Sequence, residues 1–225
     1  MIISWPVASL KDWKCTKTLC PYQLRIFFFK GKIPNSIGKL QKLERLMVID
    51  NLFSGEIPDI FSNLKWLYEL DMANNRLSGR IPMSKATCQQ LEMLVLARTA
   101  LNGSIPKQIF ELPQLKFLLL ANNSLSGFLP NKFGHLRQLE IMDICGNQLS
   151  GNIPAITEKY SILHRLNIAR NKITGSIPKS LENLAALERL DLSSNNLSGL
   201  IPTELENHNA LQMLNLSFNS LEGST

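Results

Sequence analysis

Glycine recurs every 24 residues along this chain, which constrains its fold more than any other feature does. The series is Gly31, Gly55, Gly79, Gly103, Gly127, Gly151, Gly175, Gly199 and Gly223. A proline follows three residues after each of the first eight, from Pro34 to Pro202. A period of this length indicates that one small structural unit repeats and buries its apolar face only against its neighbours. The sequence therefore predicts a stacked solenoid.

Each unit follows the pattern L-x-x-L-x-L-x-x-N-x-L-x-G-x-I-P, as in residues 187–202. The spacing of Leu187, Leu190 and Leu192 is typical of a short strand with one buried face. The Gly-x-Ile-Pro segment is expected to turn the chain, because glycine permits unusual backbone angles and proline stiffens a turn. We therefore predict about nine parallel strands, one per repeat, spaced about 4.8 Å apart.

An asparagine stands four residues before most of these glycines, between leucines that point inward. A buried amide must be hydrogen-bonded, so a column of asparagines is expected to bond the backbone of stacked turns. Thr99 replaces the asparagine in one repeat and is expected to weaken the ladder there. The members are Asn51, Asn75, Asn123, Asn147, Asn171, Asn195 and Asn219.

The LxGxIP signature resembles the plant-specific class of leucine-rich repeats, over residues 19–225. The resemblance implies an α/β repeat fold, a right-handed solenoid with a parallel β-sheet on its concave face and short helical or irregular turns on its convex face. Residues 1–18 are interpreted as a non-repeat segment, a cap remnant, and residues 19–42 as a degenerate first repeat. Residues 43–225 form eight 24-residue repeats, the last one truncated.

Charge and apolar runs exclude several classes of protein. The net charge of +6 is concentrated in residues 1–45, where nine basic residues face two acidic ones. A basic stripe along a working surface is missing, which argues against nucleic-acid binding. The chain lacks the run of about 20 apolar residues that a membrane helix needs, and its start makes a poor signal peptide.

The candidate chemistry is sparse. Cys15 and Cys20 are close enough to pair in an oxidising compartment, while Cys88 is expected to be a small buried hydrophobe. We find no motif for catalysis, for a metal or for a cofactor, so we expect none of these and no enzyme activity. Four N-x-S/T sequons are candidate glycosylation sites and agree with a secretory-pathway protein: Asn102, Asn122, Asn196 and Asn215.

The outward strand positions predict a binding surface on the concave face. The residues ten and eight places before each glycine form two columns, called minus ten and minus eight. Most of these residues are charged or polar, but in three neighbouring repeats they are mainly apolar. We expect five exposed apolar side chains to make one patch there, with Phe117 as the anchor. Arg98 and Lys116 are expected to border it on one side and Asp143 on another. The five are Met93, Val95, Phe117, Leu119 and Ile141.

The resemblance leaves three functions open. The first is a ligand-recognition ectodomain of a receptor-like kinase or receptor-like protein, binding a peptide or protein and recruiting a co-receptor kinase. The second is a secreted inhibitor of a cell-wall pectinase, resembling the polygalacturonase-inhibiting proteins. The third is an intracellular scaffold or effector. The cysteine-bearing C-terminal cap, transmembrane helix and kinase of that class are missing, which we interpret as truncation of a longer parent at the extracellular face of the plasma membrane or in the cell wall.

Overall fold

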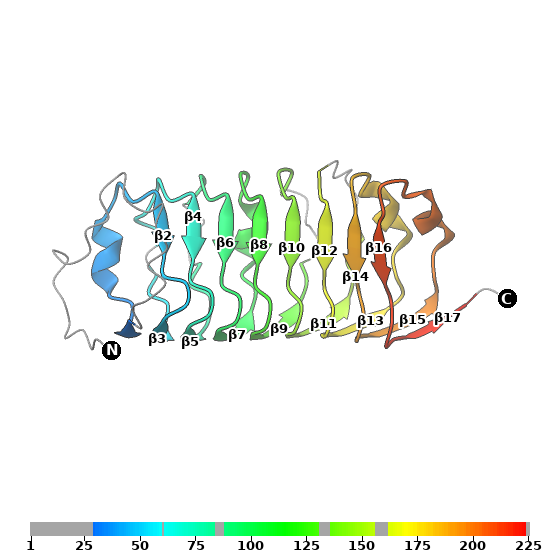
Figure 1. Ribbon diagram of the computed structural model, residues 1–225, viewed down its shortest axis with the longest axis horizontal. Coiled ribbons are helices and arrows are strands. Elements are labelled where there is room, and N and C mark those ends of the chain that lie inside the picture. Colours follow the sequence, from blue (N-terminus) through cyan, green and yellow to red (C-terminus); the bar gives the residue numbers. More distant parts are fainter. Residues whose placement is uncertain (1–28, 60, 84–87, 131–135, 156–161, 224–225) are drawn as a thin grey trace.

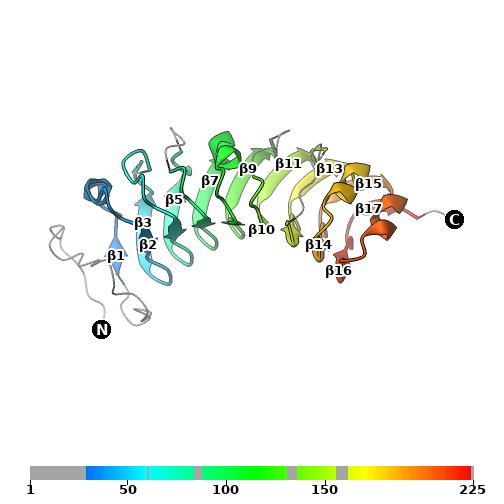
Figure 2. The same cartoon turned by 90° about the horizontal axis from the view of Figure 1, so that it is seen from above.

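The computed structural model describes residues 29–59, 61–83, 88–130, 136–155 and 162–223. These residues wind into one curved solenoid, with the first repeats at one end and the last at the other (Figures 1 and 2). Its turns are stacked through two parallel sheets that run along its length. The predicted leucine-rich-repeat solenoid is confirmed.

The concave sheet is formed by eight short parallel strands, on the inner side of the curve in Figure 2. Equivalent residues of successive repeats pair directly, so that Arg45 lies opposite Glu69 and Phe117 lies opposite Ile141. Each column of the repeat therefore runs along the solenoid axis. The strands are β2 (Arg45–Met47), β4 (Glu69–Asp71), β6 (Met93–Val95), β8 (Phe117–Leu119), β10 (Ile141–Asp143), β12 (Arg165–Asn167), β14 (Arg189–Asp191) and β16 (Met213–Asn215).

A second sheet of nine parallel strands follows the asparagine column. The prediction of one strand per repeat is therefore wrong, because the segment that includes the glycine also pairs with its neighbours. Pairing here joins residues 22 apart, as in Asn102 opposite Ser124. Because the repeat is 24 residues long, each strand of this sheet is offset by two residues from the strand of the preceding repeat. The strands are β1 (Lys30–Gly31), β3 (Leu52–Glu56), β5 (Arg76–Gly79), β7 (Ala100–Ser104), β9 (Ser124–Phe128), β11 (Gln148–Asn152), β13 (Lys172–Gly175), β15 (Asn196–Leu200) and β17 (Ser220–Glu222).

The convex side carries short 3-10 helices, as the resemblance implies. Each follows the proline of a Gly-x-Ile-Pro segment, and its first bond runs from the third helical residue back to that proline, as from Ile109 N–H to the Pro106 carbonyl. Proline suits this place because its φ is already restricted and it has no N–H to satisfy. The helices are η2 (Asn35–Lys39), η3 (Lys107–Glu111), η4 (Lys179–Asn183) and η5 (Thr203–Asn207).

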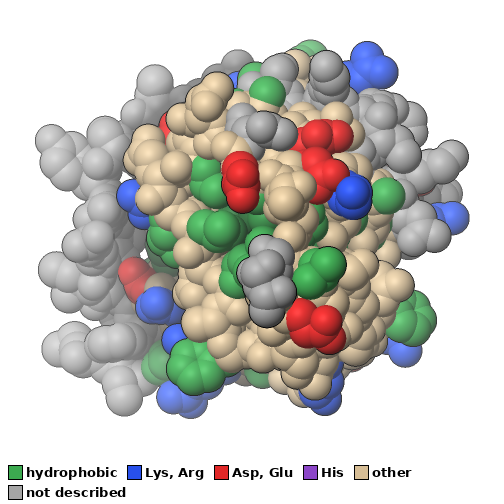
Figure 3. Space-filling model, turned by 90° about the vertical axis from the view of Figure 1, so that its right-hand side faces the viewer, with side chains coloured by type: hydrophobic (Ala, Val, Ile, Leu, Met, Phe, Trp, Pro, Cys, Tyr) green, Lys and Arg blue, Asp and Glu red, His purple; other side chains and the backbone are tan. Residues whose placement is uncertain are grey.

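The leucine columns form one continuous core between the two sheets. Leu70, Leu94 and Leu118 are fully buried at the same place in successive repeats. The last repeat differs, since Leu214 stands in this column and is 43% exposed. Figure 3 looks onto this C-terminal end and shows hydrophobic side chains across its middle, with acidic side chains among them.

The asparagines bond to the backbone of stacked turns, as predicted, and these bonds also join the two sheets, which the sequence did not predict. The Asn147 Oδ1 atom accepts the N–H of Leu125 at 3.0 Å. Its Nδ2 atom donates to the carbonyls of Leu120, Ile144 and Cys145 at 3.0, 3.0 and 3.2 Å. The Thr99 hydroxyl lies near only two acceptors, the Leu96 carbonyl at 3.2 Å and Asn123 Oδ1 at 2.5 Å. Because a hydroxyl has a single proton, Thr99 replaces only part of the amide's bonding.

Candidate ligand-binding surface

Three neighbouring strands bring the predicted apolar residues together on the concave sheet. Met93 pairs with Phe117, and Phe117 pairs with Ile141, which places them in one row. The second row joins Val95, Leu119 and then Asp143. We call Met93, Phe117, Leu119 and Ile141, which are all half-buried, the apolar strip.

Val95 does not contribute to this strip as expected. Its side chain is only 8% exposed, because it lies between Asp71 and Leu119 in the same row of adjacent strands. The prediction of five exposed apolar side chains is wrong at this position. Equivalent residues of adjacent repeats pair directly, so the side chains of this row lie close together. A side chain in it can point outward and still be covered by its two neighbours.

Arg98 and Lys116 lie at opposite ends of the strands, so the prediction that both border the strip on one side is wrong. Lys116 immediately precedes β8, whereas Arg98 follows β6 by three residues, and the strands are parallel. Lys116 Nζ lies 2.8 Å from Glu92 Oε2, and this hydrogen bond together with the carboxylate charge raises the Lys116 pKa. Arg98 is exposed and has a φ of 53°. The strip thus has a basic side chain beyond each end of its strands.

The polar residues of the minus-eight column have a structural task that sequence reasoning missed. Each accepts the backbone N–H two residues further on, which fixes the bend after its strand, a role that side chains of this kind commonly have in turns. Asp143 Oδ1 accepts the Cys145 N–H at 3.1 Å. The sequence signal for this role is an Asp or Asn at the minus-eight position with a small residue two places later. The same bond is made by Asp71, Asn167, Asp191 and Asn215.

A neutralised cluster flanks the strip on the side of the first repeats. Arg45 Nε lies 2.6 Å from Tyr68 Oη and 3.1 Å from Glu69 Oε2, and the guanidinium lies 5.1 Å from the Tyr68 ring centroid. The hydrogen bond to Tyr68 and the charge of Glu69 raise the Arg45 pKa. On the other side, Arg165 and Arg189 are exposed register partners. The strip therefore has chemically different flanks.

The four sequons occupy different surfaces. Asn102 and Asn196 are exposed on β7 and β15 of the second sheet, and Asn122 is exposed at the rim of the concave sheet with a φ of 57°. Asn215 lies on β16, where its Nδ2 atom donates to Asp191 Oδ2 at 3.3 Å. A glycan on Asn215 would therefore replace a bond within the concave sheet.

The cysteines of the repeats are free thiols. Cys88 is buried, as expected, and lies 3.0 Å from the Phe61 carbonyl. Burial raises its pKa to about 11, which keeps it a neutral thiol. Burial and the neighbouring Asp143 raise the pKa of Cys145 to about 12. Cys15 and Cys20 lie outside the described residues.

The described residues contain no group of three or more His, Cys, Asp or Glu side chains that could hold a metal ion. In the same part of the chain, no helix is both long and apolar enough to span a bilayer. The concave sheet instead offers apolar area, ion pairs and exposed guanidinium groups. This arrangement can bind a molecule by contact, charge and hydrogen bonding.

Two family models described as leucine-rich repeats match most of the solenoid. One covers residues 89–149 and 161–221, and the other covers residues 42–64 and 66–86. The chain belongs to the leucine-rich-repeat family. No curated protein matches it.

Solved structures narrow the likeness to plant members of this family. The Arabidopsis receptor kinase HAESA, solved in complex with the peptide hormone IDA and the co-receptor SERK1, is 37% identical over 87% of this chain, with a TM-score of 0.83. A TDR receptor is 38% identical over 87%, also with a TM-score of 0.83. A plant ice-binding protein is 29% identical over 85%, with a TM-score of 0.68.

This leucine-rich-repeat chain spans only part of those proteins. It covers 33% of the HAESA chain and 34% of the TDR receptor chain, but 69% of the ice-binding protein chain. The comparison with the receptors thus extends to a segment of a longer solenoid.

Proposed function

We propose that this chain is a ligand-recognition segment of a plant cell-surface receptor ectodomain, and that it binds a peptide or protein along its concave sheet. The parent would be a receptor-like kinase or receptor-like protein acting at the extracellular face of the plasma membrane or in the cell wall. Recruitment of a co-receptor kinase would follow ligand binding. HAESA supports this proposal, because it is similar over most of the chain and was solved with a peptide hormone and a co-receptor.

The observation that carries the proposal is the apolar strip. Met93, Phe117 and Ile141 stand in one row at positions that hold Glu69 and Arg165 in the flanking strands. These side chains point away from a core that the leucine columns already fill. Apolar side chains grouped on a surface and rimmed by polar ones often mark interaction sites.

The test begins with a ligand. A random twelve-residue peptide library is selected on the 225-residue chain, and the affinity of each selected peptide is measured by calorimetry. Phe117→Ala and Leu119→Asp should each weaken binding by about 2 kcal/mol or more, because buried aromatic and apolar anchors dominate interfaces. Their melting temperatures should change little, since both side chains are only half-buried.

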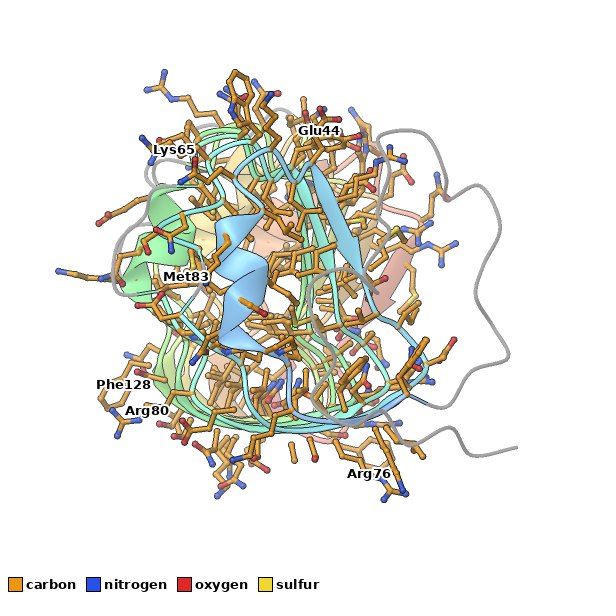
Figure 4. The ribbon with its side chains drawn as sticks, turned by 90° about the vertical axis from the view of Figure 1, so that its left-hand side faces the viewer. Glu44, Lys65, Arg76, Arg80, Met83 and Phe128 are labelled. Carbon is orange, nitrogen blue, oxygen red and sulfur yellow. The ribbon has the colours of Figure 1, made fainter. Side chains whose placement is uncertain are left out.

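Phe128→Ala is the matched control. Phe128 is 73% exposed on β9 of the second sheet, and Figure 4 shows it projecting from the corner of the solenoid opposite Glu44, the residue that precedes β2 of the concave sheet. This control removes the same side chain but should leave affinity unchanged. Equal affinities for the native chain and both concave variants would contradict the proposal.

Ice binding is a second candidate function, because one structural neighbour is a plant ice-binding protein. The second sheet carries a hydroxyl at the same position of several repeats, in Ser126, Ser150, Thr174 and Ser198. Such a regular array favours contact with an ordered surface. Thermal hysteresis that is lost in Thr174→Lys but kept in Phe117→Ala would support ice binding over peptide recognition.

A further inference from the structure

An aromatic ring, a hydroxyl and an amine stand side by side on the solvent-exposed face of the second sheet. Ser150 pairs in register with Phe128 on one side and with Lys172 on the other. Phe128 is 73% exposed, and Lys172 is exposed as well. At the usual strand spacing, the three side chains form one row about 10 Å long. We call Phe128, Ser150 and Lys172 the aromatic row.

The ring of Phe128 rests against the backbone of the next repeat. A Cβ atom built on Gly151 would come within 2.5 Å of Phe128 Cδ1 and 3.2 Å of Cε1, so the ring occupies the place of that missing side chain. Gly151 has a φ of +77°, an angle that glycine adopts readily. A ring already seated in this way loses little freedom when a ligand covers it. The row therefore presents a preformed apolar platform in a polar surface.

Side chains that can form hydrogen bonds lie on both sides of the aromatic row. Gln148 precedes Ser150 by two residues on β11, and Asn152 follows it by two and pairs with Thr174. Gln148, Asn152 and Thr174 are all exposed. Amides and hydroxyls both donate and accept hydrogen bonds. This mixture around an exposed ring is complementary to a sugar, which has hydroxyl groups at its rim and C–H groups on its faces.

Charge narrows the class of sugar. The six described strands β5, β7, β9, β11, β13 and β15 contain no aspartate or glutamate. Arg76 on β5, Arg80 directly after β5 and Lys172 on β13 are exposed. None of these three cations forms an ion pair with a carboxylate of the described residues. This face is therefore positive and complementary to a ligand that carries negative groups along its length.

We propose that the aromatic row binds an acidic polysaccharide, a chain of uronic-acid residues. One sugar packs on the Phe128 ring, and Lys172 pairs with the carboxylate of a neighbouring sugar. The Ser150 hydroxyl donates to the Gly127 carbonyl at 3.4 Å and still has a lone pair to accept from a sugar hydroxyl. The inference goes beyond the proposed function, because it uses a different sheet. An ectodomain bound in this way would be anchored to an extracellular matrix while its concave sheet stays free.

A hexamer of galacturonic acid, titrated into the 225-residue chain in a calorimeter, tests the proposal. The chain is produced without N-glycans, because the sequon residue Asn196 pairs with Thr174 beside the row. Phe128→Ala and Lys172→Gln should each bind the hexamer at least about fivefold more weakly, since an aromatic contact or a charged hydrogen bond is lost. The uncharged methyl ester of the hexamer should bind the native chain more weakly, and Lys172→Gln should make no further difference to it.

Leu200→Ala and Lys39→Gln are the matched controls. Leu200 is 59% exposed in the same column as Phe128, but its register partner is Glu222. Lys39 is exposed on η2 of the convex side, and its replacement removes the same charge as Lys172→Gln. Both controls should bind the hexamer like the native chain. Phe117→Ala should do so too, so that the failure of either proposal leaves the other standing.

Three results would overturn this inference. The first is a hexamer that does not bind, or that binds Phe128→Ala and Lys172→Gln as tightly as the native chain. The second is equal affinity for the hexamer and for cellohexaose, a neutral glucose chain, which would assign the face to uncharged polysaccharides. The third is thermal hysteresis that Phe128→Ala abolishes, without binding of the hexamer, which would assign the same face to ice.

Discussion

The two sheets of this solenoid come from the same repeats, yet they differ in which strand positions can vary. In the concave sheet the minus-ten position runs through arginine, glutamate, methionine, phenylalanine and isoleucine. In the second sheet the residue before the glycine is serine in five of the nine repeats, and the exceptions are Lys30, Asn102, Thr174 and Glu222. The second sheet keeps glycine at one position of every repeat, mostly after a small polar residue, whereas the concave minus-ten position changes at almost every step.

Backbone geometry explains this difference. In the second sheet the side chain after one glycine lies over the glycine of the next repeat, as Phe128 lies over Gly151. Gly151 has a φ of +77°, which L side chains rarely adopt. The concave strands have ordinary extended backbones and direct pairing of equivalent residues. Glycine is thus required where φ is positive and a side chain of the preceding repeat lies over the backbone, whereas the extended concave strands accept many side chains.

The largest expected effect comes from removing one asparagine of the ladder that joins the two sheets. Asn171→Ala removes an amide that accepts the Leu149 N–H and donates to the carbonyls of Ile144, Ile168 and Ala169. We expect a loss of about 3 kcal/mol in the free energy of unfolding, because buried backbone groups lose their partners. Urea unfolding followed by circular dichroism measures it. Thr99→Ala is the control and should cost about 1 kcal/mol; equal losses would show that the ladder is not what joins the sheets.

A smaller effect should separate backbone strain from crowding in the second sheet. Gly151→Ala would place a Cβ atom 2.5 Å from the Phe128 ring, whereas the same change at Gly199 meets only Ser176 Cβ at 3.9 Å. Gly199→Ala should cost about 1 to 2 kcal/mol from positive φ alone, and Gly151→Ala should cost more. The double variant Phe128→Ala/Gly151→Ala, compared with Phe128→Ala alone, should show the Gly199→Ala loss. If the two single glycine variants lose the same stability, crowding plays no part.

The smallest expected effect is an increase in stability. Thr99→Asn restores the amide that the other repeats use, so we expect about 1 kcal/mol of added stability from the extra hydrogen bonds. A melting temperature raised by a few degrees in thermal unfolding would agree. Thr99→Val, which keeps the shape but loses the hydroxyl, should lower it. A destabilising Thr99→Asn would mean that this repeat has adapted its packing to the smaller side chain.

Much of the concave sheet could be predicted from the sequence, because its residues repeat at equal positions and pair at equal positions. The asparagine ladder and the place of Phe117 beside Met93 and Ile141 both followed from counting. The second sheet was missed because its strands contain glycine and serine, which are uncommon in strands when judged one segment at a time. Their pairing appears only when the turns are stacked.

The errors at the candidate site have equally physical causes. Val95 points outward, but its neighbours Asp71 and Leu119 cover it, and burial of this kind depends on the spacing of three strands. Arg98 and Lys116 lie at opposite ends of parallel strands, because Arg98 follows β6 whereas Lys116 precedes β8. The bonds from Asp143 and its equivalents depend on the bend after each strand.

The pairing of equivalent residues also gives the concave sheet a fixed pitch. Two repeats advance about 9.6 Å along the solenoid axis at the usual strand spacing. A polyproline II helix advances about 9.3 Å in the three residues that bring side chains back to the same face. An extended β-strand returns to the same face after two residues, or about 6.7 Å, which does not fit one or two repeats. The solenoid is therefore commensurate with a left-handed polyproline ligand, whose third residue beyond a contact at Phe117 would reach the strand of Arg165.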